Sequence, residues 1–352
     1  MAFDRRELHI IRELRGLTES EVLSFVAACT PVEVGADDVL IEEGEVDRSM
    51  LFLLEGELEA YIGRPPLITT LRRVGRGEHL GELAALGLVP QRTASVRALT
   101  DASLLVIDDA GMAHLRGMSH RIVDRIESEV LLSLASQLRE TDRRIAHLAV
   151  GHITPPEPDD LWHRLLRPLT HTRPLGWPPA AVDVLQQSPH FMGLTRSVQL
   201  RLGRELEPVG FRPGDVVVEE GSSRGDAWIL AAGTVSVWRT TVGERHEQLA
   251  TLQPGALFGH LAAVDGDIRT ATCVAESPAW LYRVPRELCA TLVNNATLEG
   301  RALRRCLIDA TVQQLQQANE RLDEVNRQAE TRMRPDLYTA EDLDRLRADR
   351  QA

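Results

Sequence analysis

The sequence contains no lysine, few aromatic side chains and no long apolar run. All 40 of its basic residues are therefore arginine, and aromatic residues make up only 4% of the 352 residues. The interior must consequently be built mostly from Leu, Val, Ile and Ala. No stretch approaches the roughly 20 apolar residues of a membrane-spanning helix, and the N-terminus carries charges where a signal peptide needs an apolar segment. We therefore expect a soluble, cytoplasmic protein with no membrane contact.

Basic charge and paired cysteines are also scarce. The 40 basic residues face 52 acidic ones, which gives a net charge of −12, and no long basic run is present. This balance argues against a protein built to coat nucleic acid or an anionic membrane. The four cysteines form no CxxC pair, so the sequence predicts reduced thiols and neither a disulfide framework nor a zinc site. Because no nucleophile–base pair or metal cluster stands out, we expect no enzymatic activity and no bound metal.

One pattern occurs twice in the chain. The stretch GELAALGLVPQRTASV begins at Gly81, and the similar stretch GHLAAVDGDIRTATCV begins at Gly259. Other matches are Gly16 with Gly193, Gly44 with Gly221, and Gly56 with Gly233, each 177 residues apart. The offset is 178 at Gly81 and returns to 177 at Arg92, so the second copy has lost one loop residue. A constant offset over about eighty residues predicts a duplicated domain.

Both copies show the same order of expected elements. A short amphipathic helix is predicted over 19–28 and again over 195–205. Short β-branched or alternating segments follow at 39–41 and 57–62 in the first copy, and at 216–218 and 234–239 in the second. Alternation with period two favours half-buried strands, and several short strands at roughly ten-residue spacing predict a small antiparallel barrel or roll.

Each copy is predicted to end in a long helix, roughly over 119–148 and 298–329. Seam residues recur on both helices at alternating spacings of three and four, as in a coiled coil. They are Leu131, Leu134, Leu138, Thr141, Ile145 and Leu148, and then Ile308, Thr311, Leu315, Ala318, Leu322, Val325 and Ala329. The two helices could pair between two chains or within one chain. We expect a homodimer formed through these helices.

The remaining segments separate the two copies or follow them. Seven prolines between 151 and 181 prevent a continuous helix and predict a linker. The charged segment 331–352 is expected to be a tail. We therefore expect the first domain over 1–150 and the second over 182–330.

The repeated stretch resembles a known family. Gly81-Glu82-Leu83-Ala84, followed by Arg92-Thr93-Ala94, resembles the phosphate-binding cassette of cyclic nucleotide-binding domains. That family includes the bacterial cAMP receptor protein and the regulatory subunits of cyclic-nucleotide-dependent kinases. The resemblance covers nearly all of both copies. It implies a fold that is mainly β with α: two jelly-roll-like β-rolls, each flanked by helices and ending in a long helix.

The cassette residues suit a cyclic nucleotide, either cAMP or cGMP. Free amides at a helix start favour an anion, and Arg92 can donate charge-assisted hydrogen bonds to a phosphate. The resemblance implies that Glu82 accepts from the ribose 2′-hydroxyl and that Arg92 binds the phosphate. Thr93 can add a bond to the phosphate or to a guanine edge. The sequence does not choose between the two nucleotides.

The second copy differs from the first at the glutamate. It retains Gly259, Leu261, Arg269 and Thr270 but has His260 where the first copy has Glu82. A neutral histidine offers one acceptor nitrogen in place of two charged oxygens. The second site could bind a cyclic nucleotide weakly, bind another anion, or be a structural copy that binds nothing. We expect an intact first site and a degenerate second site.

The seam threonines are further candidates for ligand contact. The segment 136–149 resembles the dimer helix of the bacterial cAMP receptor protein, which implies that Thr141 contacts the base. Asp142 departs from the serine of that pattern. Thr311 is the corresponding threonine on the second long helix.

These observations together predict a non-catalytic cyclic nucleotide sensor. Its long helices would pass the signal to an unidentified protein partner. The resemblance includes no DNA-reading domain, and the 22-residue tail is too short for one, so direct DNA binding is not expected. The alternatives are a regulatory scaffold whose sites no longer bind and, less favoured, a transcription regulator without its own DNA-binding domain.

Overall fold

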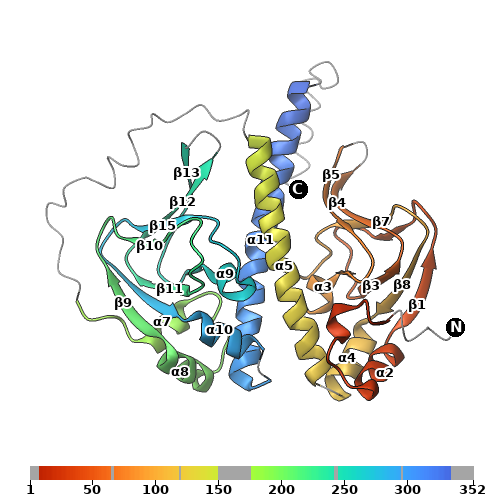
Figure 1. The fold of residues 1–352 in the computed structure, drawn as a ribbon, viewed down its shortest axis with the longest axis horizontal. Helices are drawn as coiled ribbons and strands as arrows, with labels where there is room; N and C mark the ends of the chain where they lie inside the picture. Colours follow the sequence, from red (N-terminus) through yellow and green to blue (C-terminus); the bar gives the residue numbers. More distant parts are fainter. Residues whose placement is uncertain are drawn as a thin grey trace.

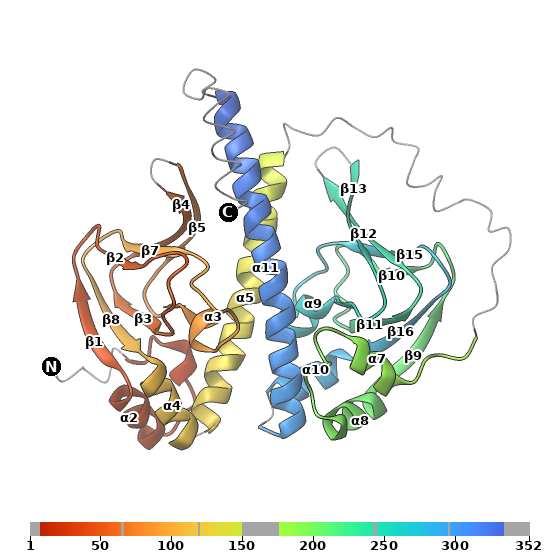
Figure 2. The ribbon, with the colours of Figure 1, turned by 180° about the vertical axis from the view of Figure 1, so that it is seen from behind.

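Two β-rolls lie on either side of a central pair of long helices (Figures 1 and 2). The computed structural model describes residues 8–64, 67–118, 120–149, 176–241, 245–294 and 296–333. Most of the expected linker and tail lies outside these residues. The predicted arrangement of two mainly β domains, each with a long C-terminal helix, is confirmed.

The first roll follows helices η1 (Arg12–Leu14) and α2 (Glu19–Ala27). Its strands are β1 (Thr30–Val34), β2 (Val39–Ile41), β3 (Met50–Glu55), β4 (Leu58–Arg64), β5 (Leu67–Val74), β6 (His79–Leu80), β7 (Ser95–Ala98) and β8 (Ala102–Ile107). They form antiparallel sheets in the orders β1-β8-β3-β6 and β2-β7-β4-β5. Helix α3 (Glu82–Ala85) follows β6, and α4 (Asp109–Met118) leads into α5 (His120–Ala149).

The second roll repeats this topology. Helices α7 (Ala181–Gln187) and α8 (Arg196–Glu205) precede it. Its strands are β9 (Glu207–Phe211), β10 (Val216–Val218), β11 (Ala227–Ala232), β12 (Val235–Thr241), β13 (Arg245–Leu252), β14 (Leu257–Phe258), β15 (Thr272–Ala275) and β16 (Ala279–Val284). Helices α9 (His260–Asp265), α10 (Arg286–Val293) and α11 (Leu298–Met333) complete it. The sheet orders β9-β16-β11-β14 and β10-β15-β12-β13 match those of the first roll strand for strand.

Matched glycines show why the two copies share local sequence. Gly56, between β3 and β4, and Gly233, between β11 and β12, turn the chain from one sheet to the other with φ of 97° and 89°. A Cβ on Gly56 would lie 2.6 Å from the carbonyl oxygen of Asp101, and one on Gly233 would lie 2.5 Å from that of Pro278. Only glycine combines a positive φ with so close an approach, so both copies depend on it.

The long helices α5 and α11 run side by side and parallel through the centre of the molecule (Figures 1 and 2). Apolar seam residues of both helices belong to one buried cluster, which includes Leu134 and Leu322 at 0% exposure. One apolar core continues from this seam into the inner faces of both rolls. The helix pair therefore holds the two rolls together as one packed body.

A buried charge cluster crosses the lower part of the helix pair. Arg304 of α11 is 1% exposed and bonds Asp124 and Glu127 of α5, with 3.2 Å from its Nε to Glu127. Its Nη1 also donates to the carbonyl of Val293 at 2.7 Å. Such a pair fixes register more than it adds stability, because burial of the charges costs much of the gain.

The long helices pair within one chain, and the expected homodimer stays a prediction. The seams that could have joined two chains contact each other within one chain. A dimer through the same faces would have to replace this intrachain contact. The structure thus selects the second of the two pairings that the sequence left open.

Leu138, which is 4% exposed in the seam, provides a test of intrachain pairing. Leu138→Asp places a charge among apolar side chains and should lower the free energy of unfolding by about 2–5 kcal/mol. Arg143→Asp, at an exposed position of the same helix, should change it by less than about 1 kcal/mol. Urea unfolding at two protein concentrations is the measurement. A wild-type midpoint that rises with concentration would contradict pairing within one chain.

Candidate functional site

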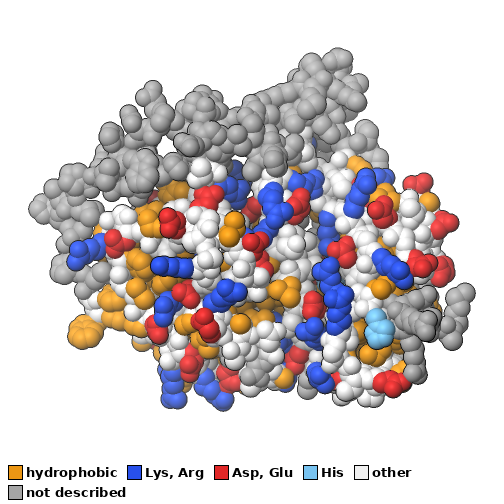
Figure 3. Space-filling model, in the orientation of Figure 1, with side chains coloured by type: hydrophobic (Ala, Val, Ile, Leu, Met, Phe, Trp, Pro, Cys, Tyr) orange, Lys and Arg blue, Asp and Glu red, His pale blue; other side chains and the backbone are white. Residues whose placement is uncertain are grey.

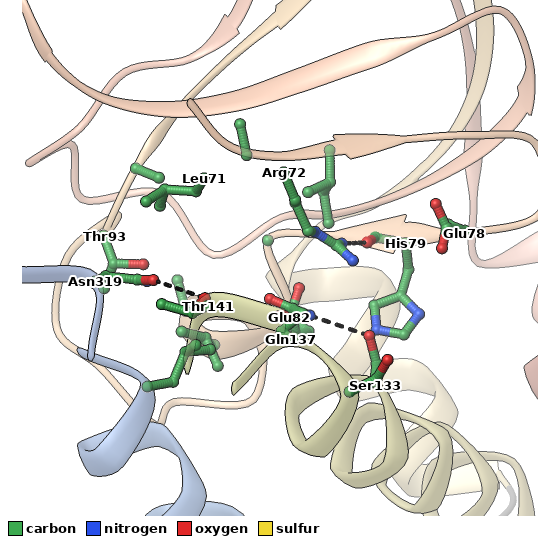
Figure 4. Close-up of a pocket in the computed structure, with 18 of the residues that line it drawn as sticks. Leu71, Arg72, Glu78, His79, Glu82, Thr93, Ser133, Gln137, Thr141 and Asn319 are labelled. Carbon is green, nitrogen blue, oxygen red and sulfur yellow. Dashed lines mark hydrogen bonds between the residues drawn. The ribbon is translucent and has the colours of Figure 1, made fainter. Parts of the chain in front are cut away.

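The first roll contains a cavity of about 420 Å³ between its cassette and the long helices (Figure 4). Strands β5 and β6, helix α3, the loop before β7, α5 and α11 line it. Every first-site residue predicted from the sequence lines this cavity: Gly81, Glu82, Leu83, Ala84, Arg92, Thr93, Ala94 and Thr141. The structure thus brings together residues that the cassette pattern and the seam pattern indicated separately.

Gly81 allows the cassette to close around an arginine. It caps α3 with φ 78°. A Cβ at this position would lie 2.6 Å from Nη1 of Arg92 and 2.7 Å from the carbonyl oxygen of Ser49. Any larger residue would displace the guanidinium, so the glycine serves the placement of Arg92 as well as the turn.

Arg92 is held by the loop after β2. It is 5% exposed. Its Nη2 donates to Ser49 at 2.7 Å (carbonyl) and 2.9 Å (Oγ) and also contacts the Asp47 carboxylate, while Nη1 donates to the Gly81 carbonyl at 3.1 Å. Burial opposes ionisation of Asp47, but hydrogen bonds from Ser49 and Arg92 outweigh it and lower the pKa of Asp47. An incoming anion would therefore compete with a charged carboxylate that is half exposed.

The remaining cassette residues divide between cavity and core. Glu82 begins α3 and is 5% exposed at the cavity wall. Ala84 is buried in the core, and Leu83 packs against that core. Thr93 is exposed at the cavity, where its hydroxyl is accessible to a ligand.

Part of the cavity wall comes from the second repeat. Leu315, Gln316 and Asn319 of α11 line the cavity opposite the cassette. The hydroxyl of Thr141 donates to Oδ1 of Asn319 at 3.4 Å (Figure 4). Sequence reasoning did not assign these α11 residues a role, because their place depends on which helices pair. The seam pattern was the signal that could have indicated them.

A second group missed from the sequence lies beside Glu82. Nδ1 of His79 and Oε1 of Glu13 are 2.5 Å apart, and both residues line the same cavity. Glu13 is 1% exposed and His79 is 5% exposed. The repeat comparison contained a signal for this pair, since the second copy has different residues at both positions.

The second cassette has the same backbone but different chemistry. Gly259 caps α9 with φ 70°, and Arg269 lies across it and donates to the carbonyls of Gly259 and Asp226. His260 is 1% exposed, and neither of its ring nitrogens has a hydrogen-bond partner. Burial, reinforced by the proximity of His190, lowers the pKa of His260 to about 4. The site therefore presents a neutral ring where the first presents a carboxylate.

The other residues predicted for the second site are partly or fully buried. Leu261 is partly buried against the core, and Thr270 is half-buried in the loop. Thr311 is fully buried in the helix pair, where its hydroxyl donates to the Leu307 carbonyl of its own helix at 2.7 Å. Its role as a ligand contact therefore stays a prediction without a supporting contact.

Helix α5 of the first repeat packs directly on the second cassette. Arg139 forms a forked pair with Asp265, at 2.6 and 3.0 Å, and donates to the Ile268 carbonyl at 2.8 Å. Asp142, which stands where the resemblance has a serine, contacts Arg239 of β12 at 3.3 Å. One face of α5 thus lines the first cavity while another contacts the second roll.

Comparison with known families agrees with this geometry. The profile described as "Cyclic nucleotide-binding domain" matches residues 31–116 and 208–296. Each of the two rolls is a cyclic nucleotide-binding domain. The matched segments contain the strands and cassettes of both rolls, while α5 and α11 lie outside them.

Several known proteins are similar over longer parts of the chain. Mouse cGMP-dependent protein kinase 2 is 25% identical over 264 residues, which cover 75% of this chain and 27% of the kinase. The human enzyme of the same name is 27% identical over 67% of this chain and 24% of its own length. The chain thus spans about a quarter of these relatives. A solved regulatory domain of Toxoplasma gondii PKA with cAMP is 16% identical, with 83% of this chain and 95% of that chain covered and a TM-score of 0.30.

Two features are absent from the described residues. Among them, no helix is both long enough and apolar enough to cross a membrane. Nor do the described His, Cys, Asp and Glu side chains form a group of three or more that could hold a metal ion.

The buried His260 makes stability depend on pH. Its pKa lies at about 4 when folded against an ordinary 6.5, so between these values the unfolded chain binds a proton that the folded chain excludes. Stability should therefore be lost as pH falls from 6.5 to 4, by about 3 kcal/mol. In His260→Leu this loss should be smaller, whereas His114→Leu, at an exposed position, should retain it. Urea unfolding between pH 4 and 7 tests this, and identical profiles for wild type and His260→Leu would contradict it.

Proposed function

We propose that this protein is a non-catalytic sensor of cAMP or cGMP. The first roll binds the nucleotide, and the long helices pass its binding to a protein partner. The observation that supports this most strongly is the cavity at the first cassette. It gathers Glu82, Arg92, Thr93 and Thr141 and is walled by residues from both repeats.

The cavity offers a matching group for each part of a cyclic nucleotide. Arg92 would exchange the Asp47 carboxylate for the cyclic phosphate, with the amides at the start of α3 adding to the attraction. Glu82 would accept a hydrogen bond from the ribose hydroxyl. Thr141 and Asn319, already joined at 3.4 Å, would face the base. The binding energy would come from charge-assisted bonds inside the cavity.

The second roll would be a weaker or non-binding copy. His260 lacks the carboxylate oxygens that a ribose hydroxyl needs, and burial favours its neutral form. Arg139 of α5 also holds the Asp265–Ile268 loop that precedes Arg269. A ligand at this cassette would have to accommodate both the neutral ring and the covering helix. A structural role for the second roll is therefore favoured over nucleotide binding.

Signal transfer would pass through α5. Gln137 and Thr141 line the first cavity, and Arg139 and Asp142 contact the second roll from the same two turns. A ligand that favours one position of α5 would therefore shift the contacts with the second cassette, by no more than its difference in affinity for the two positions. The partner would be a protein that recognises this arrangement.

The surface is consistent with a protein partner. On the face shown in Figure 3, arginine and carboxylate side chains are interspersed rather than segregated. Recognition of DNA phosphates would favour clustered basic side chains. We therefore propose regulation of a cytoplasmic protein rather than direct DNA binding. A kinase is one such partner, because the relatives named above are cGMP-dependent kinases.

Arg92 provides the most direct test of the first site. Arg92→Ala removes the cation that would pair with the buried phosphate and should weaken binding by about 2–5 kcal/mol, or roughly 30-fold or more. Arg116→Ala, at an exposed position of α4, should leave affinity unchanged. Titration of each protein with fluorescent cAMP and cGMP measures the effect. Equal affinity in wild type and Arg92→Ala would refute the assignment of this cassette.

A further inference from the structure

Three ionisable side chains are gathered at one part of the first cavity. Glu13 from η1 and His79 from β6 form a buried pair at 2.5 Å. Glu82 lies three residues after His79, at the start of α3. Its charge raises the pKa of the histidine. Figure 4 shows His79 and Glu82 on adjoining parts of the cavity wall. The carboxylate proposed to bind ribose therefore has a histidine and a second carboxylate beside it.

The second repeat has replaced all three of these residues. The repeat offsets place His190 at the position of Glu13, Leu257 at that of His79, and His260 at that of Glu82. Strand register supports this correspondence, because His79 pairs with Phe52 across β3 and β6, and Leu257 pairs with Ile229 across β11 and β14. His190 also acts electrostatically on His260, as expected if the two positions face each other in both copies.

The electrostatics explain why the three residues would change together. Two carboxylates, Glu13 and Glu82, lie buried on the same wall, and each would be costly without a compensating cation. Burial alone would lower the pKa of His79, but the hydrogen bond and charge of Glu13, together with the charge of Glu82, raise it above its ordinary value. His79 therefore pairs directly with Glu13 and interacts electrostatically with Glu82.

Other neighbours of His79 either affect protonation of its ring less than Glu13 does or oppose it. Arg72 of β5 donates to the His79 backbone carbonyl at 2.5 Å, and its charge opposes protonation of the ring. The Phe52 ring of β3 lies 6.3 Å from the imidazole and is uncharged. Glu129 of α5 lines the same cavity. The Glu13 contact is the direct one, since it joins the imidazole nitrogen itself.

We propose that His79, held by Glu13, is a positioning residue of the first site that keeps Glu82 in place to accept the ribose hydroxyl. This inference rests on the proposed function. His79 acts through Glu82 and does not itself contact the nucleotide. The three residues work as a unit, and the second repeat, with His190, Leu257 and His260, has lost the whole unit. His260 alone therefore does not account for the difference between the two sites.

The first experiment exchanges His79 for the residue that the second repeat uses. His79→Leu should fold, because Leu257 occupies the same place in β14. Its affinity for cAMP and cGMP should fall about tenfold, equivalent to about 1.4 kcal/mol. The matched control is His114→Leu on the exposed face of α4, which should bind as wild type does.

The second experiment measures affinity against pH and distinguishes positioning from a purely structural role. Wild-type affinity should be highest while His79 is protonated and should fall as pH rises through its raised pKa. His79→Leu should bind weakly with no such dependence. In Glu13→Gln the histidine loses its main anionic partner, so the fall should move to lower pH. Binding by calorimetry or fluorescence between pH 5.5 and 9, limits chosen to bracket the ordinary histidine range, gives all three profiles.

The outcomes separate this inference from the proposed function. Wild type could bind with a pH profile that is unchanged in both Glu13→Gln and His79→Leu. This result would overturn the role of His79 but leave the proposed function standing. A weaker His79→Leu whose pH profile still matches that of wild type would show a packing role only, and would also overturn it. If wild type binds neither nucleotide at any pH tested, the proposed function fails and this inference fails with it.

Discussion

The pairing of α5 with α11 inside one chain is the contact on which the rest of the structure depends. It buries the seam of each helix, including Leu134 and Leu322 at 0% exposure, and it continues the cores of both rolls into one. Because the helices are parallel neighbours, α11 reaches the first cavity and α5 reaches the second cassette. Each of the two domains therefore has a helix of the other repeat packed beside its cassette.

The repeat, the two rolls and the first cassette could be predicted from the sequence. These features follow from local patterns, such as the glycines whose positive φ is needed between strands and at the start of α3. The choice of helix partner could not be predicted, because a heptad seam specifies a complementary face and does not specify which chain carries it. The contribution of Asn319 to the first cavity and the contact of Asp142 with Arg239 follow from that choice. Both were therefore beyond sequence reasoning.

The two cassettes show how one backbone can support unequal chemistry. In both, a glycine with positive φ lets an arginine lie across the start of a short helix. In the first roll the arginine contacts a carboxylate and the wall carries Glu82, whereas in the second it donates to two backbone carbonyls and the wall carries a neutral His260. The free-energy cost of burying Glu82 therefore differs from that of burying His260, because a buried carboxylate needs a compensating cation and a neutral ring does not. The second roll, which lacks the carboxylate, therefore needs no compensating cation at this position, whereas the first roll does.

Under the proposed function, one chain holds one working nucleotide site, built from both repeats. Calorimetric titration of the full-length protein with cAMP, and separately with cGMP, tests it most directly because it counts sites as well as measuring affinity. We expect about one nucleotide bound per chain at the tighter affinity, with any second binding event at least about tenfold weaker. Two equal sites per chain would contradict it, and so would no binding of either nucleotide.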